Sequence, residues 1–538
     1  MGIPARLVGV LLVLGLLPLA APAGAGVLAA SPPAAGPTVY REFTYEKTRV
    51  AMRDGIELSV ELWRPVTGGV NVPVILHLTP YHVLSPTNSP DRLPAGDAAR
   101  YVPKGYAYAF ADVRGTWASG GCWDYGGLKE RQDGYDLVEW LGTRDWSNGK
   151  VAMTGVSYPG TTPNAAAVEQ PPHLATIVPI SGISRWWGYA YQQGTRSTYS
   201  GESADIDPPS DTPTDFQYGY GFLPPPDPAA LSKPEQLAMR WTLCDRVEQT
   251  LHGYATEPDY DAFWRERDYL ALADRVQVPV LVSHGQLDYN VKTWEGTAWY
   301  EALDVPKALV LGQWAHASPR GRYPDWDRFL DRWFERWLYG VENGVEHEPP
   351  VRVQTNDGRW HLQQDWGTAA TTPRTLPLAG GDVRYLDDGA LTESEMLRGV
   401  GAGTRFTRVT VPNSSGLRFG GRPVLHLSAT SDAPSTHFVA VLCDVGADGV
   451  CKVVSRAFLN ARYRDTLEQG SDLVPGRRYR YALEFIDKDY VVAPDRHLEL
   501  LIASSSATWV ASDERRASNT LHLAESSLEL PVYPPTGG

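Results

Sequence analysis

The ten residues Val151-Ala-Met-Thr-Gly-Val-Ser-Tyr-Pro-Gly160 are the stretch that decides the fold class of this chain. The first four residues predict a buried strand, Gly155 predicts a sharp turn after it, and an alanine-rich run starting at Ala165 predicts a helix. A serine on such a strand-to-helix turn is exposed and lies beside backbone N–H groups that can hold an oxyanion. Ser157 is therefore a candidate nucleophile.

This turn departs from the G-x-S-x-G pattern at one position. Pro159 stands where the second glycine belongs, and Gly160 follows one residue later. A serine with a purely structural role in a turn also fits so short a stretch. The assignment of Ser157 therefore depends on the rest of the chain.

Two later strands end in residues that complete a catalytic triad with Ser157. Asp288 follows the apolar run 278–283, and His316 follows the apolar run 307–311. Open α/β sheets carry their sites at the carboxyl ends of strands, and α/β-hydrolases have the chain order serine, acid, histidine. We expect Asp288 to orient the imidazole of His316, and His316 to act as the base.

Tyr81 follows another strand, the run 72–78. Its hydroxyl is a candidate oxyanion donor beside the backbone N–H of Tyr158. A tyrosine that only packs at the mouth of the sheet is the alternative. His284 competes with His316 as the base, but it precedes the acid and so has the wrong order.

The first 30 residues predict a secretory signal peptide. Arg6 supplies a positive charge, an apolar run spans 7–19, and it is followed by the candidate cleavage stretches Ala23-Gly-Ala25 and Leu28-Ala-Ala30. The apolar run is too short for a comfortable membrane span, although an uncleaved anchor is the alternative. We expect a secreted, extracellular protein that has no membrane partner after cleavage.

The remaining chain divides into three regions. Alternating strands and helices over 38–183 and 271–345 predict an α/β-hydrolase catalytic domain with a mostly parallel sheet. The aromatic and proline-rich stretch 184–270 predicts an inserted helical cap. Short alternating strands over 349–538 predict a C-terminal all-β sandwich or jelly roll.

The composition excludes several classes of partner. The 49 basic and 63 acidic residues give a net charge of −14, which argues against nucleic acid and anionic membranes. Neither a phosphate loop, a dinucleotide fingerprint nor a metal-ligand cluster is evident, so no cofactor and no metal are expected. Asp112 with Arg114 is interpreted as a structural ion pair. The sequence leaves the oligomeric state open, a homo-oligomer included.

Four cysteines agree with export to an oxidising compartment. Cys443 and Cys451 flank a turn-rich stretch between strand-like runs, which indicates a disulfide across a hairpin. Cys122 and Cys244 would then form the second pair. Four cysteines allow three connectivities, so the other two pairings stay open.

Several stretches together resemble a known family. They are Thr79-Pro-Tyr81, Asp112-Val-Arg-Gly-Thr-Trp-Ala-Ser-Gly-Gly121, Trp146-Ser-Asn-Gly-Lys150 and Gly155-Val-Ser-Tyr-Pro-Gly160. In order and type they resemble the cocaine esterase and Xaa-Pro dipeptidyl-peptidase family of serine hydrolases, over nearly the whole mature chain. The resemblance implies a hydrolase core, a helical cap and a jelly roll. It also implies the triad Ser157, Asp288 and His316, with Tyr81 as oxyanion donor.

Two stretches look closer to the dipeptidyl-peptidases than to the esterases. His284-Gly-Gln-Leu-Asp-Tyr-Asn-Val-Lys292 is similar to their HGxxDxNVK pattern, and Gly182-Ile-Ser-Arg-Trp-Trp-Gly-Tyr189 to GISxWYxY. Gly201-Glu-Ser-Ala-Asp205 resembles their GED element. The resemblance implies a peptide substrate with a free N-terminus and a penultimate proline. The residues it implies are Trp186, Tyr189 and Val291 around the proline, and Glu202 with Asn290 at the α-amine.

Two departures weaken the exopeptidase reading. Trp187 replaces the family's tyrosine, and Ser203 replaces the acid after Glu202. An esterase or acylase acting on small esters or amides is therefore the alternative activity. A third hypothesis, from a different class, is a binding protein whose jelly roll holds a polymer or a surface.

Overall fold

The computed structural model describes residues 39–82, 91–197, 258–513 and 516–534. The predicted signal peptide, Glu202, Cys244 and most of the predicted cap lie outside the described residues. None of the helices within the described ranges is both long and apolar enough to cross a membrane.

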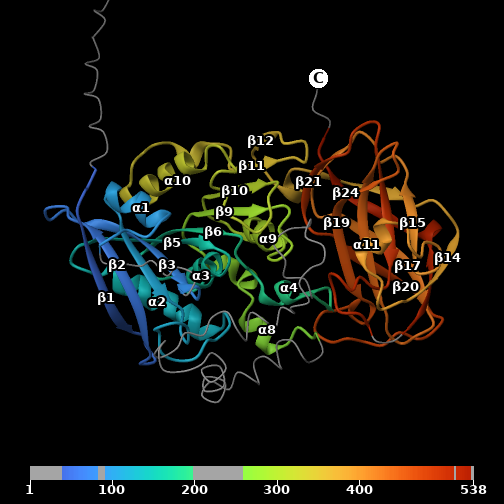
Figure 1. The fold of residues 1–538 in the computed structure, drawn as a ribbon, viewed down its shortest axis with the longest axis horizontal. Coiled ribbons are helices and arrows are strands. Elements are labelled where there is room, and N and C mark those ends of the chain that lie inside the picture. The colour runs from blue at the N-terminus through green and yellow to red at the C-terminus, as the bar shows by residue number, and fades with distance from the viewer. Residues whose placement is uncertain (1–38, 83–90, 198–257, 514–515, 535–538) are drawn as a thin grey trace, which may run out of the picture. The chain divides into compact units, whose positions relative to one another are not determined.

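The N-terminal part of the described chain is built on a ten-stranded mixed sheet, coloured blue to yellow in Figure 1. The strands from β4 to β11 in the order given below run parallel, and β1, β2 and β12 pair antiparallel at the two edges. The order is β1 (Phe43–Ala51), β2 (Glu57–Pro65), β4 (Ala107–Asp112), β3 (Val72–Thr79), β5 (Ser147–Val156), β6 (Leu174–Ile180), β9 (Val280–Gly285), β10 (Lys307–Gly312), β11 (Val351–Gln354) and β12 (Trp360–Gln363).

Helices cover both faces of this sheet. Along β3, Val74 and Leu76 belong to one buried core, whereas Ile75 belongs to another, as the period-two alternation of a strand requires. The first core also contains residues of α2 (Leu128–Gly142), α3 (Tyr158–Ala167) and α9 (Trp294–Ala302). The second contains residues of α1 (Asp97–Tyr101) and α10 (Trp326–Phe334). The predicted α/β sheet covered on both faces is confirmed.

Strands β11 and β12 lie beyond residue 345, where the predicted catalytic domain ends. β11 pairs parallel with β10, and β12 pairs antiparallel with β11. The mixed sheet therefore runs further along the chain than the predicted domain. Short helical turns complete this description: η2 (Val102–Lys104), η4 (Leu270–Arg275), η5 (Glu335–Tyr339), η6 (Val345–His347), η7 (Gly367–Ala369), η8 (Ala461–Tyr463) and η9 (Leu523–Glu525).

The C-terminal part is all-β apart from short helices such as α11 (Glu393–Leu397), which agrees with the predicted β-rich domain. An eight-stranded and a four-stranded sheet share a core of apolar side chains. The first contains β13 (Thr372–Pro377), β14 (Asp382–Leu386), β16 (Arg418–Gly421), β17 (Val424–Ser431), β20 (Arg478–Glu484), β21 (Lys488–Val491), β23 (Ser518–His522) and β24 (Ser527–Val532). The second contains β15 (Phe406–Val411), β22 (His497–Ala503), β18 (His437–Val445) and β19 (Cys451–Asn460).

One of the predicted disulfides closes the β18–β19 hairpin. Cys443 and Cys451 are bonded, with their Cα atoms 5.1 Å apart, which confirms this pair. Cys122 is also disulfide-bonded. Its predicted partner, Cys244, lies outside the described residues.

Short elements connect the two parts of the described chain. They are α4 (Trp186–Ala190), β7 (Tyr191–Gln192), β8 (Thr195–Arg196) and α8 (Ala262–Glu266). Gln192 Nε2 donates a hydrogen bond of 3.0 Å to the carbonyl of Glu484 in β20. Gln193 Nε2 donates one of 2.8 Å to the carbonyl of Ala482 in the same strand. These bonds join the catalytic part directly to the β-rich part.

Candidate active site

Ser157 stands on the turn between β5 and α3. It is the N-cap of α3, with φ +72° and ψ −126°, and it is half-buried. A non-glycine residue with such a positive φ carries strain of order 1–3 kcal/mol, which the surrounding packing has to offset. The Ser157 N–H donates to the carbonyl of Ile180 at the end of β6, at 2.9 Å. The turn thus holds the serine in a strained, partly exposed position at the carboxyl end of the central strands.

The departure at Pro159 has a steric explanation. A Cβ on Gly155 would lie 2.4 Å from Cβ of Pro159, so the first glycine makes room for the proline. A Cβ on Gly160 would lie 2.3 Å from the carbonyl oxygen of Ile180. The glycine that lets α3 approach β6 is therefore Gly160, one residue after the position given by the usual pattern.

Asp288 and His316 follow the neighbouring parallel strands β9 and β10. Nδ1 of His316 lies 2.7 Å from Oδ2 of the fully buried Asp288 carboxylate. The other carboxylate oxygen accepts the backbone N–H groups of Asn290 at 3.1 Å and Val291 at 3.0 Å. Because Nδ1 then carries the ring proton, the acceptor lone pair of the neutral imidazole is on Nε2.

The pKa of Asp288 is lowered despite its burial. Burial alone would raise this pKa, but electrostatic attraction to His316, its hydrogen bond and the nearby ring of His284 outweigh the effect of burial. The carboxylate therefore stays ionised at neutral pH, as a group that orients an imidazole must.

Tyr81 lies beside the serine. Its hydroxyl is 3.3 Å from Oγ of Ser157, and it accepts a hydrogen bond from the main chain of Tyr158. Burial raises the pKa of Tyr81, although the bonds to Ser157 and Tyr158 partly oppose this. The phenol keeps its proton at neutral pH, so one hydroxyl and one backbone N–H meet next to the serine oxygen.

Aromatic side chains from α4 pack near this turn. The ring of Trp186 lies 5.5 Å from that of Tyr158, and the Tyr189 hydroxyl donates to Oδ1 of Asn290 at 3.1 Å. The predicted binding residues within the described chain are all buried: Trp186, Tyr189, Asn290 and Val291. The structure thus brings Trp186, Tyr189 and Asn290 into one connected group near the serine turn.

A cavity of about 670 Å³ opens beside the same strand ends. Its lining includes Tyr81, Val156, Pro159 and Ser318. This volume lies within the range of small-molecule sites in proteins. Ser157, Asp288 and His316 do not line it, so Tyr81 is the candidate site residue that this cavity reaches.

Sequence reasoning missed a buried network behind the turn. The hydroxyl of Tyr158 donates to Oε2 of Glu130 at 2.5 Å and accepts the indole N–H of Trp123 at 2.7 Å. Glu130 also accepts the backbone N–H of Asp124. Burial, followed by the charge of Asp124, raises the pKa of Glu130 to about 8. No sequence spacing signals this network, because it depends on how α2 packs against α3.

His284 also takes a place that its position in the chain did not indicate. Its Nε2 donates to the carbonyl of Val291 at 2.7 Å and lies 3.5 Å from Oδ2 of Asp288. The ring is fully buried. His284 is therefore a second imidazole beside the acid, and it fixes the chain segment that follows Asp288.

The interpretation of Asp112 with Arg114 as an ion pair is wrong. Arg114 instead bonds Asp133 through two contacts of 2.5 and 2.6 Å, and Asp54 at 2.9 Å. Asp112 bonds Nδ1 of His82 at 2.8 Å. Asp112 is the last residue of β4, whereas Arg114 lies in the turn that follows, so the two side chains find different partners.

The serine turn after a central parallel strand, together with the sheet order, defines the fold as that of an α/β-hydrolase with an added C-terminal β domain. The model of the X-Pro dipeptidyl-peptidase (S15) family matches residues 54–318, and the model of the X-Pro dipeptidyl-peptidase C-terminal non-catalytic domain matches 343–531. The chain belongs to this hydrolase family.

Individual relatives agree with this assignment. A Bacillus anthracis protein named "Putative Xaa-Pro dipeptidyl-peptidase" is 27% identical over 535 residues, covering 89% of this chain and 85% of the relative. Cocaine esterase of a Rhodococcus species is 25% identical, covering 85% and 90%. The solved structure of an aminopeptidase from a marine sediment Thaumarchaeota archaeon has a TM-score of 0.71 at 19% identity, over 94% of this chain and 99% of that one. This last likeness shows the shared fold.

Proposed function

We propose that this protein is a secreted serine exopeptidase that releases Xaa-Pro dipeptides from the N-termini of peptides. The observation that carries the proposal is the set of groups that follow the parallel strands of one sheet. The strained Ser157 lies beside the Tyr81 hydroxyl and the backbone N–H of Tyr158, and the bonded pair Asp288–His316 follows β9 and β10. This is the set of groups that acyl transfer requires: a nucleophile, a base with its orienting acid, and oxyanion donors.

In the proposed reaction, Nε2 of His316 takes the proton of the Ser157 hydroxyl as Oγ attacks the carbonyl carbon of the penultimate proline. The Tyr81 hydroxyl and the Tyr158 N–H donate to the oxyanion that forms. The C–N bond breaks as His316 gives its proton to the leaving amine. Water then attacks the acyl-enzyme, again losing a proton to His316, and the dipeptide acid is released with the serine restored.

Selection of the substrate would rest on the aromatic side chains of α4 and on a carboxylate. A proline ring is flat and apolar, so the rings of Trp186 and Tyr189 suit it. A protonated α-amine in a partly buried pocket needs an anionic partner, because an unpaired buried charge is costly. We assign that role to Glu202, and we assign a further contact with the amine to Asn290. An amine held two residues from the scissile bond limits the product to dipeptides.

An esterase or acylase of the same family is the second candidate. The 25% identity to a cocaine esterase over 85% of this chain favours it, as does Ser203 in place of an acid. In that case the triad and oxyanion donors would act unchanged on an acyl group without a free amine.

A comparison of three substrates separates the two candidates. They are a free-amine Xaa-Pro anilide, its N-acetylated twin and a simple aryl ester. We expect strong preference for the free amine, and we expect Glu202→Gln to remove this preference while ester cleavage persists. Equal rates on the acetylated twin would contradict the exopeptidase. Ser157→Ala should abolish turnover of all three, and retained turnover would contradict the triad.

The proposed export is tested separately. The full chain expressed in a secreting bacterial host should appear in the medium with its N-terminus near residue 30. Recovery of the intact N-terminus from the cell fraction alone would contradict a cleaved signal peptide.

A further inference from the structure

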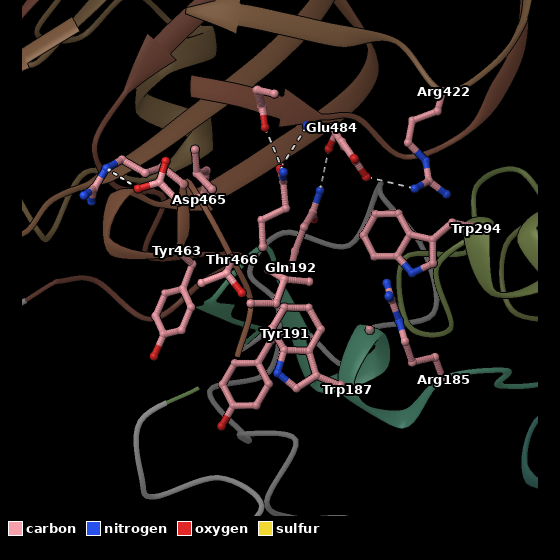
Figure 2. Close-up of a pocket in the computed structure, with 16 residues that line it drawn as sticks. Arg185, Trp187, Tyr191, Gln192, Trp294, Arg422, Tyr463, Asp465, Thr466 and Glu484 are labelled. Carbon is pink, nitrogen blue, oxygen red and sulfur yellow. Dashed lines mark hydrogen bonds and ion pairs between the residues drawn. The ribbon is translucent and has the colours of Figure 1, made fainter. Parts of the chain in front are cut away.

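A second cavity, of about 450 Å³, lies where α4 and β7 meet the β-rich part of the chain (Figure 2). Arg185 and Trp187 line it from the catalytic part together with Trp294, and Arg422, Tyr463 and Glu484 line it from the β-rich part. Ser157, Asp288 and His316 do not line it. The cavity is therefore distinct from the candidate active site.

The charges in this cavity do not balance. Three arginines and two carboxylates line it. Arg422 donates to Glu484 at 2.9 Å and to Asp487 at 2.8 Å. Arg464 pairs with Asp465 at 3.2 Å. Each lining carboxylate thus has an arginine of its own, and Arg185 remains.

The guanidinium of Arg185 has no hydrogen bond or ion pair with any residue that the structure describes. It lies 5.7 Å from the centre of the Trp187 ring and is half-buried. Its own backbone N–H is fixed by Oε2 of Glu295 at 2.9 Å. A partly desolvated cation on a fixed backbone, inside a cavity, indicates a site for an anion.

The tryptophan side chains of the cavity indicate what the uncharged part of that anion is. Figure 2 shows the Arg185 side chain directed toward the Trp294 end of the cavity, with Trp187 beside it. The indole N–H groups of both tryptophans are engaged, with the carbonyl of Pro258 at 3.0 Å and with Glu295 at 3.2 Å. Their rings therefore offer apolar contact rather than hydrogen bonds. Flat hydrophobic groups pack well against such rings.

We propose that this cavity binds a small carboxylate that carries a flat hydrophobic group. The carboxylate pairs with Arg185, whose planar guanidinium matches its two oxygens, and the hydrophobic group lies against Trp187 and Trp294. A singly charged ligand fits better than a phosphate, because Asp465 and Glu484 line the same cavity. The volume admits a small molecule and not a folded partner.

The site is next to the candidate active site but does not share its residues. On α4, Trp186 contacts Tyr158 and Tyr189 contacts Asn290, whereas Trp187 lines the cavity. The proposal stands on Arg185 and the two indoles, and it does not depend on which acyl substrate Ser157 attacks.

Calorimetric titration of the full chain with phenylacetate tests the site, with uncharged phenylacetamide as the matched ligand. We expect phenylacetate to bind at least tenfold more tightly than the amide. Arg185→Gln should weaken phenylacetate binding at least tenfold, whereas Arg477→Gln, an exposed arginine outside the cavity, should leave it unchanged. Equal binding of acid and amide, tighter binding of phenyl phosphate, or no loss in Arg185→Gln would each overturn the proposal.

A second variant and a chemical block of the catalytic serine complete the binding test. Should Arg185→Gln fail to fold, Arg185→Lys keeps the charge but not the planar fork, and it should still weaken binding several-fold. Prior reaction with phenylmethanesulfonyl fluoride, a reagent for nucleophilic serines, should leave phenylacetate binding unchanged. Loss of binding after that reaction would locate the probe at the catalytic serine and overturn the proposal, while leaving the proposed function intact.

Discussion

The hydroxyl of Tyr158 donates a hydrogen bond of 2.5 Å to the buried carboxyl of Glu130. Tyr158 is the residue after the candidate nucleophile and the first residue of α3. Its ring is fixed by Glu130 and Trp123, so the direction of its backbone N–H is set by a network inside the protein. The proposed oxyanion donor is therefore positioned by the buried side chains of Glu130 and Trp123.

This network should make stability depend on pH. The pKa of Glu130 is about 8 in the folded protein against a usual 4.5. Between these values the folded state keeps a proton that the unfolded chain releases, so the free energy of unfolding falls as pH rises from about 4.5 to 8. Glu130→Gln mimics the protonated form and does not titrate. The free energy of unfolding of this variant should therefore fall less over this pH range than that of the wild type, by up to about 5 kcal/mol. Denaturant unfolding of both proteins at several pH values in this window measures the difference.

The exposed Glu46→Gln is the matched control for Glu130→Gln, and its unfolding should follow the wild type at every pH. A constant difference between wild type and Glu130→Gln from pH 4.5 to 8 would contradict a buried, proton-retaining Glu130.

Removal of the Tyr81 hydroxyl tests the proposed oxyanion site. Tyr81→Phe keeps the ring but loses the donor, and loss of one such donor lowers kcat by about 10²–10³. KM should change little, because the interaction forms mainly in the transition state. Tyr479→Phe, a tyrosine of the β-rich part, should leave both constants unchanged. An unaltered kcat in Tyr81→Phe would show that Tyr81 only packs at the mouth of the sheet.

Replacing Asp288 by asparagine should lower kcat more than removal of the Tyr81 hydroxyl does. In Asp288→Asn an amide N–H2 faces Nδ1 of His316 and favours the wrong tautomer, so kcat should fall by about 10⁴. The turn should survive, because the asparagine oxygen can still accept the N–H groups of Asn290 and Val291. The exposed Asp145→Asn is the control. The kcat of both variants is measured from initial rates with the free-amine anilide. A loss of kcat below tenfold in Asp288→Asn would be incompatible with a catalytic triad.

Much of the fold could be predicted because short, local sequence patterns determine its elements. The strand-turn-helix at Ser157 and the apolar runs before Asp288 and His316 are short and contiguous, and strand ends in parallel sheets meet at one edge. The boundary near residue 345 was harder, because β11 joins the mixed sheet through pairing with β10, far away in sequence.

The supporting residues could not be predicted in the same way. Glu130 looks like any helical glutamate until α2 is packed against α3. Arg114 bonds Asp133 of α2, not Asp112, because it lies in the turn after β4, within reach of that helix. Such contacts depend on tertiary packing, which a single sequence shows only as composition.

Gly160, rather than residue 159, lets α3 approach β6, and this close approach can be tested. A Cβ at residue 160 would lie 2.3 Å from the carbonyl oxygen of Ile180 and 2.9 Å from that of Gly155, and backbone atoms cannot yield as a flexible side chain does. Gly160→Ala should therefore lower the free energy of unfolding by at least about 2 kcal/mol and displace Ser157. Gly381→Ala is the control, because nothing lies within 4 Å of its added Cβ, and it should be neutral or slightly stabilising. Thermal unfolding of both variants checks the difference, and a Gly160→Ala protein as stable and active as the wild type would show that α3 does not need this close approach.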